Sequence, residues 1–396
     1  MLHYILGDME FNIFINKYLN KTSFLLKKSS RLPEEFSTID FEQYLIAGEG
    51  NLQNLIRIIK DGDSIITVPS ELNDSKTQHE FVIKQFNSGA TLKLEELSSR
   101  NEFITKLCKV IEAEFYGICY AKAFLTNAQQ KGLKVHFDIA DVFVVQLEGT
   151  KRWRVWDKLV DLPVISMQKV LEEENLDIPI IDTILEPGDI LYIPGGTPHA
   201  AECSNDYSLH MSFGLEPLKI HEVISGYFKI LSEVDERLRQ NIHPFSNKLE
   251  LANLFRTSLE KTARENFNHI LEDFFVAYNA GKHQNNNCRL YSIAQANKIN
   301  NETKLFIRND SGLKLKNTGD NLALYYSSTI APKKPLILTP PYLQLPLYCK
   351  AELEYIIQNQ GKVVNTSSMP GLLDEESKQL LCIELITLGI INVFRK

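Results

Sequence analysis

The sequence predicts a mixed α and β protein in which a β-barrel of the jelly-roll kind is followed by a helical region and a small mixed unit. Three observations carry this prediction. Short apolar segments separated by glycine and proline turns fill residues 135–215, long segments with helical spacing follow Pro217, and strand and helix signals alternate after residue 300. The chain has 396 residues, 44% of them hydrophobic, so it can form more than one core.

The region from Val135 to Leu215 has the pattern of antiparallel β structure. Glu148-Gly149 is a turn signal between an apolar strand and a strand that alternates polar and apolar residues, and Pro187-Gly188-Asp189 is a second turn. Many short strands joined in this way are typical of barrels and sandwiches, which include double-stranded jelly rolls. The predicted strands are Val142–Leu147, Lys151–Trp156, Thr183–Leu185, Ile190–Ile193 and Ser208–Gly214.

The residues before this region mix helix and strand signals. Leu52–Lys60 has helical spacing, and Ser64–Val68 is a candidate strand. Glu102–Glu114 reads as an amphipathic helix with its apolar residues on one side, and it leads into a predicted strand at Tyr116–Leu125.

The character of the chain changes after Pro217. His221–Asn241 and Asn247–Ala280 have helical spacing and are joined by a short loop that contains Pro244, which predicts an antiparallel helical hairpin. Its apolar stripe must be buried, either on the barrel or against a second copy of itself.

The last hundred residues predict a third unit. Strands are expected within Leu305–Tyr326, and the acidic residues at Asp374 suit the first turn of a helix. The order helix, helix, strand resembles a winged helix. The predicted elements are the helices Pro346–Asn359 and Asp374–Leu388 and the strand Ile390–Arg395.

The composition limits the classes of function. The formal net charge of −7 argues against a strongly basic surface, so direct nucleic-acid binding is not expected. The six cysteines are scattered without a CxxC pair, which argues against a zinc ribbon and favours reduced thiols in a cytoplasmic protein. The first residues do not have the pattern of a signal peptide, and no apolar stretch approaches about 18 residues, so no transmembrane helix is expected.

Three polar residues of the barrel region suggest a metal site. His136 and Asp138 are two apart, so on one strand both side chains would point to the same face. His199 lies 199 − 136 = 63 positions later, after a bend at Pro194 and two glycines that can return it to the barrel. Each part alone is common without a metal. Together they predict a facial triad that leaves sites open on iron, although the same ligands also bind Mn, Co, Ni or Zn.

The segments around these residues resemble a known family. HFDIADVFVVQLEGTKRWRVWD, from His136 to Asp157, and PGDILYIPGGTPHAAEC, followed by SLHMSFG, closely resemble the core of the JmjC ribosomal oxygenases of the cupin superfamily. The motifs match over about residues 120–215, and beyond them only the layout is similar. The resemblance implies Fe(II), 2-oxoglutarate and O₂, and a 2-oxoglutarate-dependent dioxygenase that hydroxylates arginine or histidine in ribosomal proteins.

The same resemblance implies a division into three domains. Residues 1–217 would form the JmjC/cupin catalytic domain, 218–285 a helical dimerisation region, and 286–396 a winged-helix-like domain. A homodimer and a protein or peptide substrate are therefore expected.

Lys151 is the residue that corresponds to the family's basic group for the far carboxylate of 2-oxoglutarate. A lysine inside a barrel is costly unless it is paired, and a dicarboxylate would pair it; otherwise it is a surface residue at the end of a hairpin. Ser208 and His210 share a face on a later strand. Ser208 is a candidate for cosubstrate binding, while the role of His210 stays open.

Three positions depart from the family pattern. Phe124 stands where a tyrosine is frequent and lacks the hydroxyl that would bind the cosubstrate, so only its position marks it as a cosubstrate residue. Lys122 replaces an asparagine, and Gly195 replaces an arginine. These changes leave the substrate open.

Hydroxylation of a protein side chain, most of all in a ribosomal protein, is the leading hypothesis. The departures at Lys122, Phe124 and Gly195 also suit a hydroxylase of another peptide, such as a natural-product precursor. A third hypothesis is a non-catalytic dimeric cupin that acts as a binding module, and the retained ligands and Lys151 argue against it.

Overall fold

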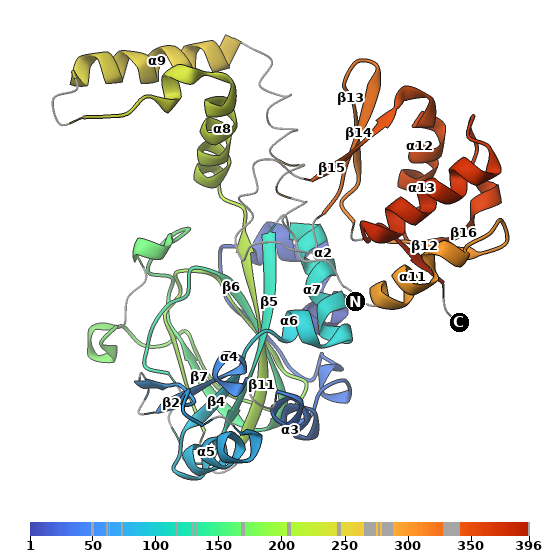
Figure 1. The fold of residues 1–396 in the computed structure, drawn as a ribbon. Coiled ribbons are helices and arrows are strands. Elements are labelled where there is room, and N and C mark those ends of the chain that lie inside the picture. The colour runs from blue at the N-terminus through green and yellow to red at the C-terminus, as the bar shows by residue number, and fades with distance from the viewer. Residues whose placement is uncertain are drawn as a thin grey trace. The chain divides into compact units, whose positions relative to one another are not determined.

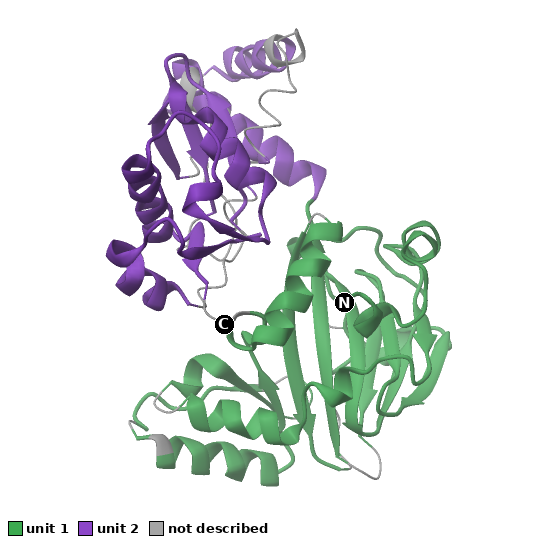
Figure 2. Cartoon of the chain, turned by 90° about the vertical axis from the view of Figure 1, so that its right-hand side faces the viewer, with its two compact units in different colours: residues 1–218 green, residues 219–396 purple. Residues whose placement is uncertain are grey.

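The computed structural model divides the chain into two compact units, Met1–Leu218 and Lys219–Lys396 (Figure 2). The structure describes residues 1–396 except 49–50, 61, 63, 73, 116, 129, 131–132, 168–170, 204–206, 244–246, 265–274, 276–277, 279–287, 310, 328–340 and 395–396. All six cysteines are free thiols, and only Cys288 is exposed. None of the helices in these described ranges is long and apolar enough to cross a membrane.

Unit 1 is built on two antiparallel sheets. The larger sheet has the strand order β1-β9-β6-β11-β5-β4-β2-β3, and the smaller has the order β10-β7-β8. Their strands are β1 (Phe24–Leu26), β2 (Ile56–Lys60), β3 (Ser64–Ile66), β4 (Thr91–Leu94), β5 (Gly117–Thr126), β6 (Asp141–Gly149), β7 (Lys151–Val155), β8 (Ile181–Leu185), β9 (Ile190–Ile193), β10 (His199–Glu202) and β11 (Ser208–Pro217). The five strands predicted between residues 135 and 215 are confirmed, with shifted ends.

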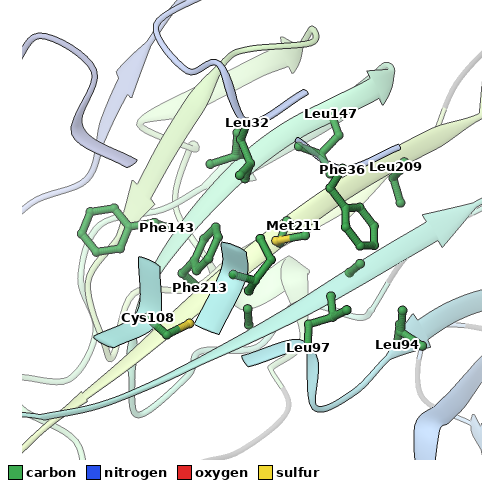
Figure 3. Close-up of a cluster of buried hydrophobic side chains, with 14 of the residues drawn as sticks. Leu32, Phe36, Leu94, Leu97, Cys108, Phe143, Leu147, Leu209, Met211 and Phe213 are labelled. Carbon is green, nitrogen blue, oxygen red and sulfur yellow. The ribbon is translucent and has the colours of Figure 1, made fainter. Parts of the chain in front are cut away.

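Strand β11 lies at the centre of the larger sheet and separates two environments. It pairs with β5 on one side and with β6 on the other. Leu209, Met211 and Phe213 are fully buried on one face of β11, in the hydrophobic core shown in Figure 3. The residues between them, His210 and Ser212, line a pocket on the opposite face. This alternation is the consequence of the two-residue period of a strand.

Helices cover the core face of the larger sheet. Helix α7 (Glu102–Phe115) lies beside β5 and buries Ile104, Leu107 and Ile111, as its helical spacing predicts (Figure 1). The other helical segments of unit 1 are α1 (His3–Leu6), α2 (Phe11–Ile13), η1 (Phe14–Tyr18), η2 (Leu32–Glu34), α3 (Thr38–Ala47), α4 (Leu52–Leu55), α5 (Ser75–Asn87), α6 (Leu97–Arg100), η3 (Ile165–Met167) and η4 (Glu173–Asn175).

The prediction of a helix over Leu52–Lys60 is wrong for its second half. The helix ends at Leu55, and Ile56–Lys60 forms β2, which pairs with both β3 and β4. The three isoleucines of this segment are β-branched and fit a pleated sheet, and their pairing overrides the local helical spacing.

Unit 2 begins with two helices, α8 (Ile220–Val234) and α9 (Lys248–Arg264). The predicted helix His221–Asn241 is too long, because Asp235 ends α8 by accepting a hydrogen bond from the backbone of Arg237 and starts the 3₁₀ turn η5 (Glu236–Arg239). The predicted loop at Pro244 and most of the predicted helix beyond Arg264 lie outside the described residues.

The rest of unit 2 has its own core and two small sheets, with the strand orders β16-β12-β17 and β13-β14-β15. The helices and the last strand predicted for this region are confirmed. The elements are α11 (Arg289–Gln295), η6 (Ala296–Lys298), β12 (Lys304–Ile307), β13 (Lys314–Asn317), β14 (Asn321–Tyr325), β15 (Tyr342–Pro346), η7 (Leu347–Cys349), α12 (Lys350–Gln358), β16 (Val363–Asn365), η8 (Thr366–Ser368), α13 (Glu375–Thr387) and β17 (Ile391–Val393).

Candidate metal centre and pocket

His136, Asp138 and His199 lie together in unit 1. One possible ligand atom from each residue can be chosen so that all three atoms lie within 4.8 Å of one another. Nε2 of His199 is 3.6 Å from Oδ2 of Asp138. Among the described residues this is the group of histidine, cysteine and acidic side chains with the geometry to hold a metal ion.

The expectation that His136 and Asp138 share a strand is wrong. His136 forms a single antiparallel bridge with His199, and Asp138 is in a loop. The backbone N–H of His199 donates to the carbonyl of His136 at 2.9 Å, and the N–H of His136 donates to the carbonyl of His199 at 3.3 Å. The N–H of Gly196 donates to the carbonyl of Asp138 at 2.8 Å. The two segments therefore hold each other in place without a continuous strand.

Both imidazole rings are oriented by backbone carbonyls. Nδ1 of His136 is 2.7 Å from the carbonyl oxygen of Lys134, and Nδ1 of His199 is 3.0 Å from that of Thr197. A carbonyl only accepts, so each Nδ1 carries the proton and each Nε2 keeps a lone pair. Burial, with His136 close by, lowers the pKa of His199 to about 4, so its ring is neutral at neutral pH. These are the protonation and orientation that metal-binding histidines require.

The turn before His199 is fixed by a buried carboxylate. Asp141 accepts hydrogen bonds from the hydroxyl of Tyr192 at 2.6 Å and from the backbone N–H of Gly195 at 2.8 Å. Gly196 has a φ of +82°, and a Cβ placed on it would lie 1.8 Å from the carbonyl oxygen of Val160. The turn therefore requires glycine at position 196 for its backbone angle and for the space around it.

The pocket beside the candidate metal centre receives side chains from both sheets of unit 1. Its three lysines, one phenylalanine and one tryptophan come from β4, β5 and β7, and the three candidate ligands form part of its wall. The lining residues are Ile59, Thr91, Lys93, Tyr120, Lys122, Phe124, Leu133, His136, Asp138, Val142, Val144, Lys151, Trp153, His199, Ala200, Ala201, His210, Ser212 and Gly214.

Lys151 is buried in this pocket, with only 2% of its surface exposed, so it is not a surface lysine at a hairpin end. Its Nζ donates to Oγ1 of Thr126 at 2.9 Å, and Oγ1 of Thr126 is 3.1 Å from Oγ1 of Thr91. Burial lowers the pKa of Lys151 to about 8. An ammonium that faces a pocket with hydroxyl partners is suited to bind an anion.

Three rings form the wall next to Lys151. The rings of Phe124 and His210 are parallel with centroids 4.9 Å apart, and Trp153 meets His210 edge-on. Nδ1 of His210 and Nε1 of Trp153 are buried without a hydrogen-bond partner. Two donors or acceptors in this wall are therefore free to meet a bound molecule.

The other predicted cosubstrate residue, Ser208, does not line the pocket. It is fully buried, and its Oγ accepts a hydrogen bond from Nε2 of Gln146 at 2.9 Å. The sequence reasoning missed Thr91 and Thr126. The predicted strand ended at Leu125, one residue short of Thr126, and no local pattern indicates that β4 brings Thr91 beside it.

Lys122 and Lys93 lie on the pocket side of β5 and β4, where they share one carboxylate. Nζ of Lys93 is 2.8 Å from Glu95, and Nζ of Lys122 is 3.8 Å from the same side chain. Burial and the neighbouring Lys93 lower the pKa of Lys122.

Comparison with known proteins gives these features a family context. Residues 96–223 match the JmjC domain family. The matched part contains His136, Asp138, Lys151 and His199.

The relatives in sequence are ribosomal oxygenases and similar proteins. The chain is 29% identical to ribosomal oxygenase 2 of Mus musculus over 39% of this chain and 34% of that protein. It is 33% identical to ribosomal oxygenase 1 of Rattus norvegicus over 32% of this chain and 22% of that protein. The matched region thus spans about a third or less of these relatives.

The fold resembles that of a bacterial protein over nearly the whole chain. The crystal structure of the Escherichia coli ribosomal oxygenase YcfD aligns with 98% of this chain and 98% of its own, with a TM-score of 0.58 and 18% identity. A structure of YcfD in complex with cobalt and 2-oxoglutarate aligns with a TM-score of 0.56 and 18% identity, covering 97% of this chain and 98% of that chain. At this identity the comparison establishes a shared fold.

We predict that Gly196→Ala lowers the free energy of unfolding of unit 1 by about 2–4 kcal/mol, because it adds backbone strain and a clash with the carbonyl of Val160. Gly319→Ala, in unit 2, is the control for backbone strain alone: Gly319 has a φ of +86° with no atom within 4 Å of an added Cβ, so the free energy of unfolding of unit 2 should fall by about 1 kcal/mol. Urea unfolding followed by circular dichroism measures both. Equal losses in the two variants would contradict the steric part of this account.

Proposed function

We propose that this chain is an Fe(II)- and 2-oxoglutarate-dependent oxygenase that hydroxylates an amino-acid side chain in a protein, with a ribosomal protein as the favoured substrate. The observation that carries the proposal is the group of His136, Asp138 and His199, with both histidines turned by backbone carbonyls so that Nε2 is available. The JmjC match and the ribosomal oxygenases among the relatives support the reaction class and the substrate.

In this proposal Nε2 of His136, Nε2 of His199 and the carboxylate of Asp138 hold the iron. The set fits, because it combines two neutral imidazoles with one carboxylate and leaves coordination sites for other molecules. Iron with 2-oxoglutarate and O₂ supplies the oxidation that converts a C–H bond into C–OH, while 2-oxoglutarate becomes succinate and CO₂. The bridge between His136 and His199 joins the two segments that carry the proposed ligands.

Lys151 is proposed to bind the far carboxylate of 2-oxoglutarate. Its ammonium is buried in the same pocket as the ligands, and Thr126 and Thr91 orient it. Phe124 contributes an apolar wall in contact with His210, because it has no hydroxyl to donate. Ser208 would act only indirectly, through Gln146.

The substrate and cellular context are proposals of the same kind. The relatives' names favour a ribosomal protein, and the net charge of −7 argues against direct nucleic-acid binding by the chain. We place the enzyme in the cytoplasm and divide it into a catalytic domain at 1–217, a dimerisation region at 218–285 and a winged-helix-like domain at 286–396.

His136→Ala removes one candidate ligand, so we predict that it abolishes the conversion of 2-oxoglutarate to succinate. Purified wild-type chain with Fe(II), 2-oxoglutarate and a ribosomal extract is expected to add 16 Da (one oxygen atom) to a protein, and the variant to add none. His243→Ala, which changes a histidine of the exposed segment after α8, is the matched control and should retain activity. Succinate formation by the His136 variant at the wild-type rate would refute the metal assignment.

Lys151→Met is predicted to weaken 2-oxoglutarate binding on the order of 100-fold, since removing one partner of a buried charge pair costs about 2–5 kcal/mol. Binding is measured by calorimetry with Mn(II) in place of iron. Lys106→Met, an exposed lysine of α7, is the control and should bind normally.

The affinity for 2-oxoglutarate should also depend on pH. The pKa of Lys151 is about 8 in the absence of an anion, and a bound carboxylate would raise it. The charged form is half populated at about pH 8 and predominates below it, so the affinity should fall as the pH rises through and above that value. An affinity that stays constant up to pH 10 would contradict this role of Lys151.

We further propose that α8 and α9 form a homodimer interface. Ile220, Ile224 and Phe255 are large apolar side chains on these helices and are 79%, 50% and 56% exposed. Burial of such surface against a second copy would explain the exposure.

Ile224→Asp combined with Phe255→Asp is expected to convert the dimer into a monomer, because it buries two charges in an apolar interface. Light scattering coupled to size-exclusion chromatography measures the mass. Leu290→Asp, on α11 and 86% exposed, is the control and should leave the mass unchanged. A wild-type chain that is monomeric at micromolar concentration refutes the proposal.

A further inference from the structure

The charges around the pocket carry information about the substrate side chain. Three lysines line it (Lys93, Lys122 and Lys151), and Asp138 is the only carboxylate among the described lining residues. Asp138 belongs to the candidate metal centre, so it is not available to a substrate. A substrate side chain that enters the pocket therefore meets positive charge on its wall.

Lys122 is held in the pocket by its neighbours on the strand. It lies between Tyr120 and Phe124 on the pocket-facing side of β5, and it pairs with Ser212 of β11. Its Nζ is 4.5 Å from the ring centroid of Tyr120. The Tyr120 ring lies against Gly214, where an added Cβ would come within 2.3 Å of it. A side chain at position 214 would therefore displace the ring that contacts Lys122.

The negative charge near these lysines is not enough to neutralise them. Glu95 is shared, at 2.8 Å from Lys93 and 3.8 Å from Lys122, and the side chains of all three are only 20–29% exposed. Glu216 lies further along β11, is exposed and does not line the pocket. One carboxylate against two ammonium groups leaves this part of the pocket wall positively charged.

The charges of the candidate metal centre, of Lys151 and of the cosubstrate cancel one another under the proposed function. A divalent metal ion and Lys151 together offset Asp138 and a doubly negative cosubstrate. The surplus on Lys93 and Lys122 is thus the net charge that a substrate side chain meets. A positively charged group in this partly buried place is repelled, whereas a hydrogen-bond acceptor can accept a hydrogen bond from Nζ of Lys122.

We infer that the side chain hydroxylated by this enzyme carries no positive charge and offers a hydrogen-bond acceptor to Lys122, which makes Lys122 a specificity-determining residue. The inference rests on the proposed function and narrows it: neutral histidine, asparagine, glutamine and acidic residues fit the pocket, and arginine and lysine do not.

The test uses the full chain with Fe(II), 2-oxoglutarate and synthetic peptide libraries that differ in one fixed central residue: Arg, Lys, His, Asn, Gln, Asp or Glu. The flanking positions are degenerate and contain none of these residues. Mass spectrometry locates the added oxygen, and succinate release gives the rate. Among the libraries with His, Asn, Gln, Asp or Glu at the fixed position, the best should be hydroxylated about tenfold or more faster than the arginine and lysine libraries.

Lys122→Glu reverses the charge and is expected to move the preference toward arginine and lysine by about tenfold. Lys106→Glu, an exposed lysine of α7 that also pairs with a glutamate, is the matched control and should keep the wild-type preference. Lys122→Met serves if the first variant does not fold, and it should reduce the discrimination without reversing it. Thermal unfolding of each variant establishes that it is folded.

The outcomes separate this inference from the function on which it rests. If none of the libraries is converted, the hydroxylated residue is identified in a ribosomal extract instead. A hydroxylated arginine or lysine in that extract overturns the inference. The same holds if the arginine library is preferred or if Lys122→Glu leaves the preference unchanged. Absence of 2-oxoglutarate conversion with all libraries and with the extract overturns the proposed function, and the inference with it.

Discussion

The reciprocal hydrogen bonds between the backbones of His136 and His199 are the constraint on which the site depends. The two residues are far apart in the sequence; His199 begins β10, and His136 pairs with it through an isolated bridge. Their bridge, together with the bond from Gly196 to the carbonyl of Asp138, brings three candidate ligands within a few ångströms. Because the backbone makes these contacts, the side chains remain free for a metal. The carbonyls of Lys134 and Thr197 then set the orientation of the rings.

The larger sheet is the second feature on which the site depends. One of its faces carries apolar side chains of the core, and the other carries polar and charged side chains that line the pocket. Strands β5 and β11 run side by side over their whole length, and both change environment at every residue. Their inward residues join a single hydrophobic core with α7, and this core keeps the register of the strands fixed. A slip of one residue would exchange Met211 for His210 in the core, so the core that stabilises unit 1 also determines which residues reach the pocket.

The sequence was sufficient to predict the strands of unit 1 other than β1, β2, β4 and β10, the three residues of the candidate metal centre and the place of Lys151 after the turn at Gly149. These rest on local patterns: turns at Gly149 and Gly188, and histidine and aspartate at fixed spacing. The partners of Lys151 could not be predicted, because Thr91 and Thr126 meet through the register of strands that are distant in the sequence. The contact of Glu95 with both Lys93 and Lys122 could not be predicted either, because it also depends on the pairing of distant strands. At Ile56, sheet pairing overrode a helical spacing that extended to Lys60, and the three isoleucines of the segment were the local signal that favoured a strand.

Lys151 also has a consequence for how the protein persists in the cell. A buried ammonium with one hydroxyl partner makes the ligand-free barrel less stable than an apolar side chain would. A molecule that binds only the folded chain and supplies the missing negative charge raises its stability by mass action. Under the proposed function 2-oxoglutarate would be that molecule, and the folded fraction of the chain, and with it the lifetime against proteolysis, would follow the supply of a central metabolite. The proposed contact at Lys151 would then couple the abundance of the protein to the metabolic state of the cell.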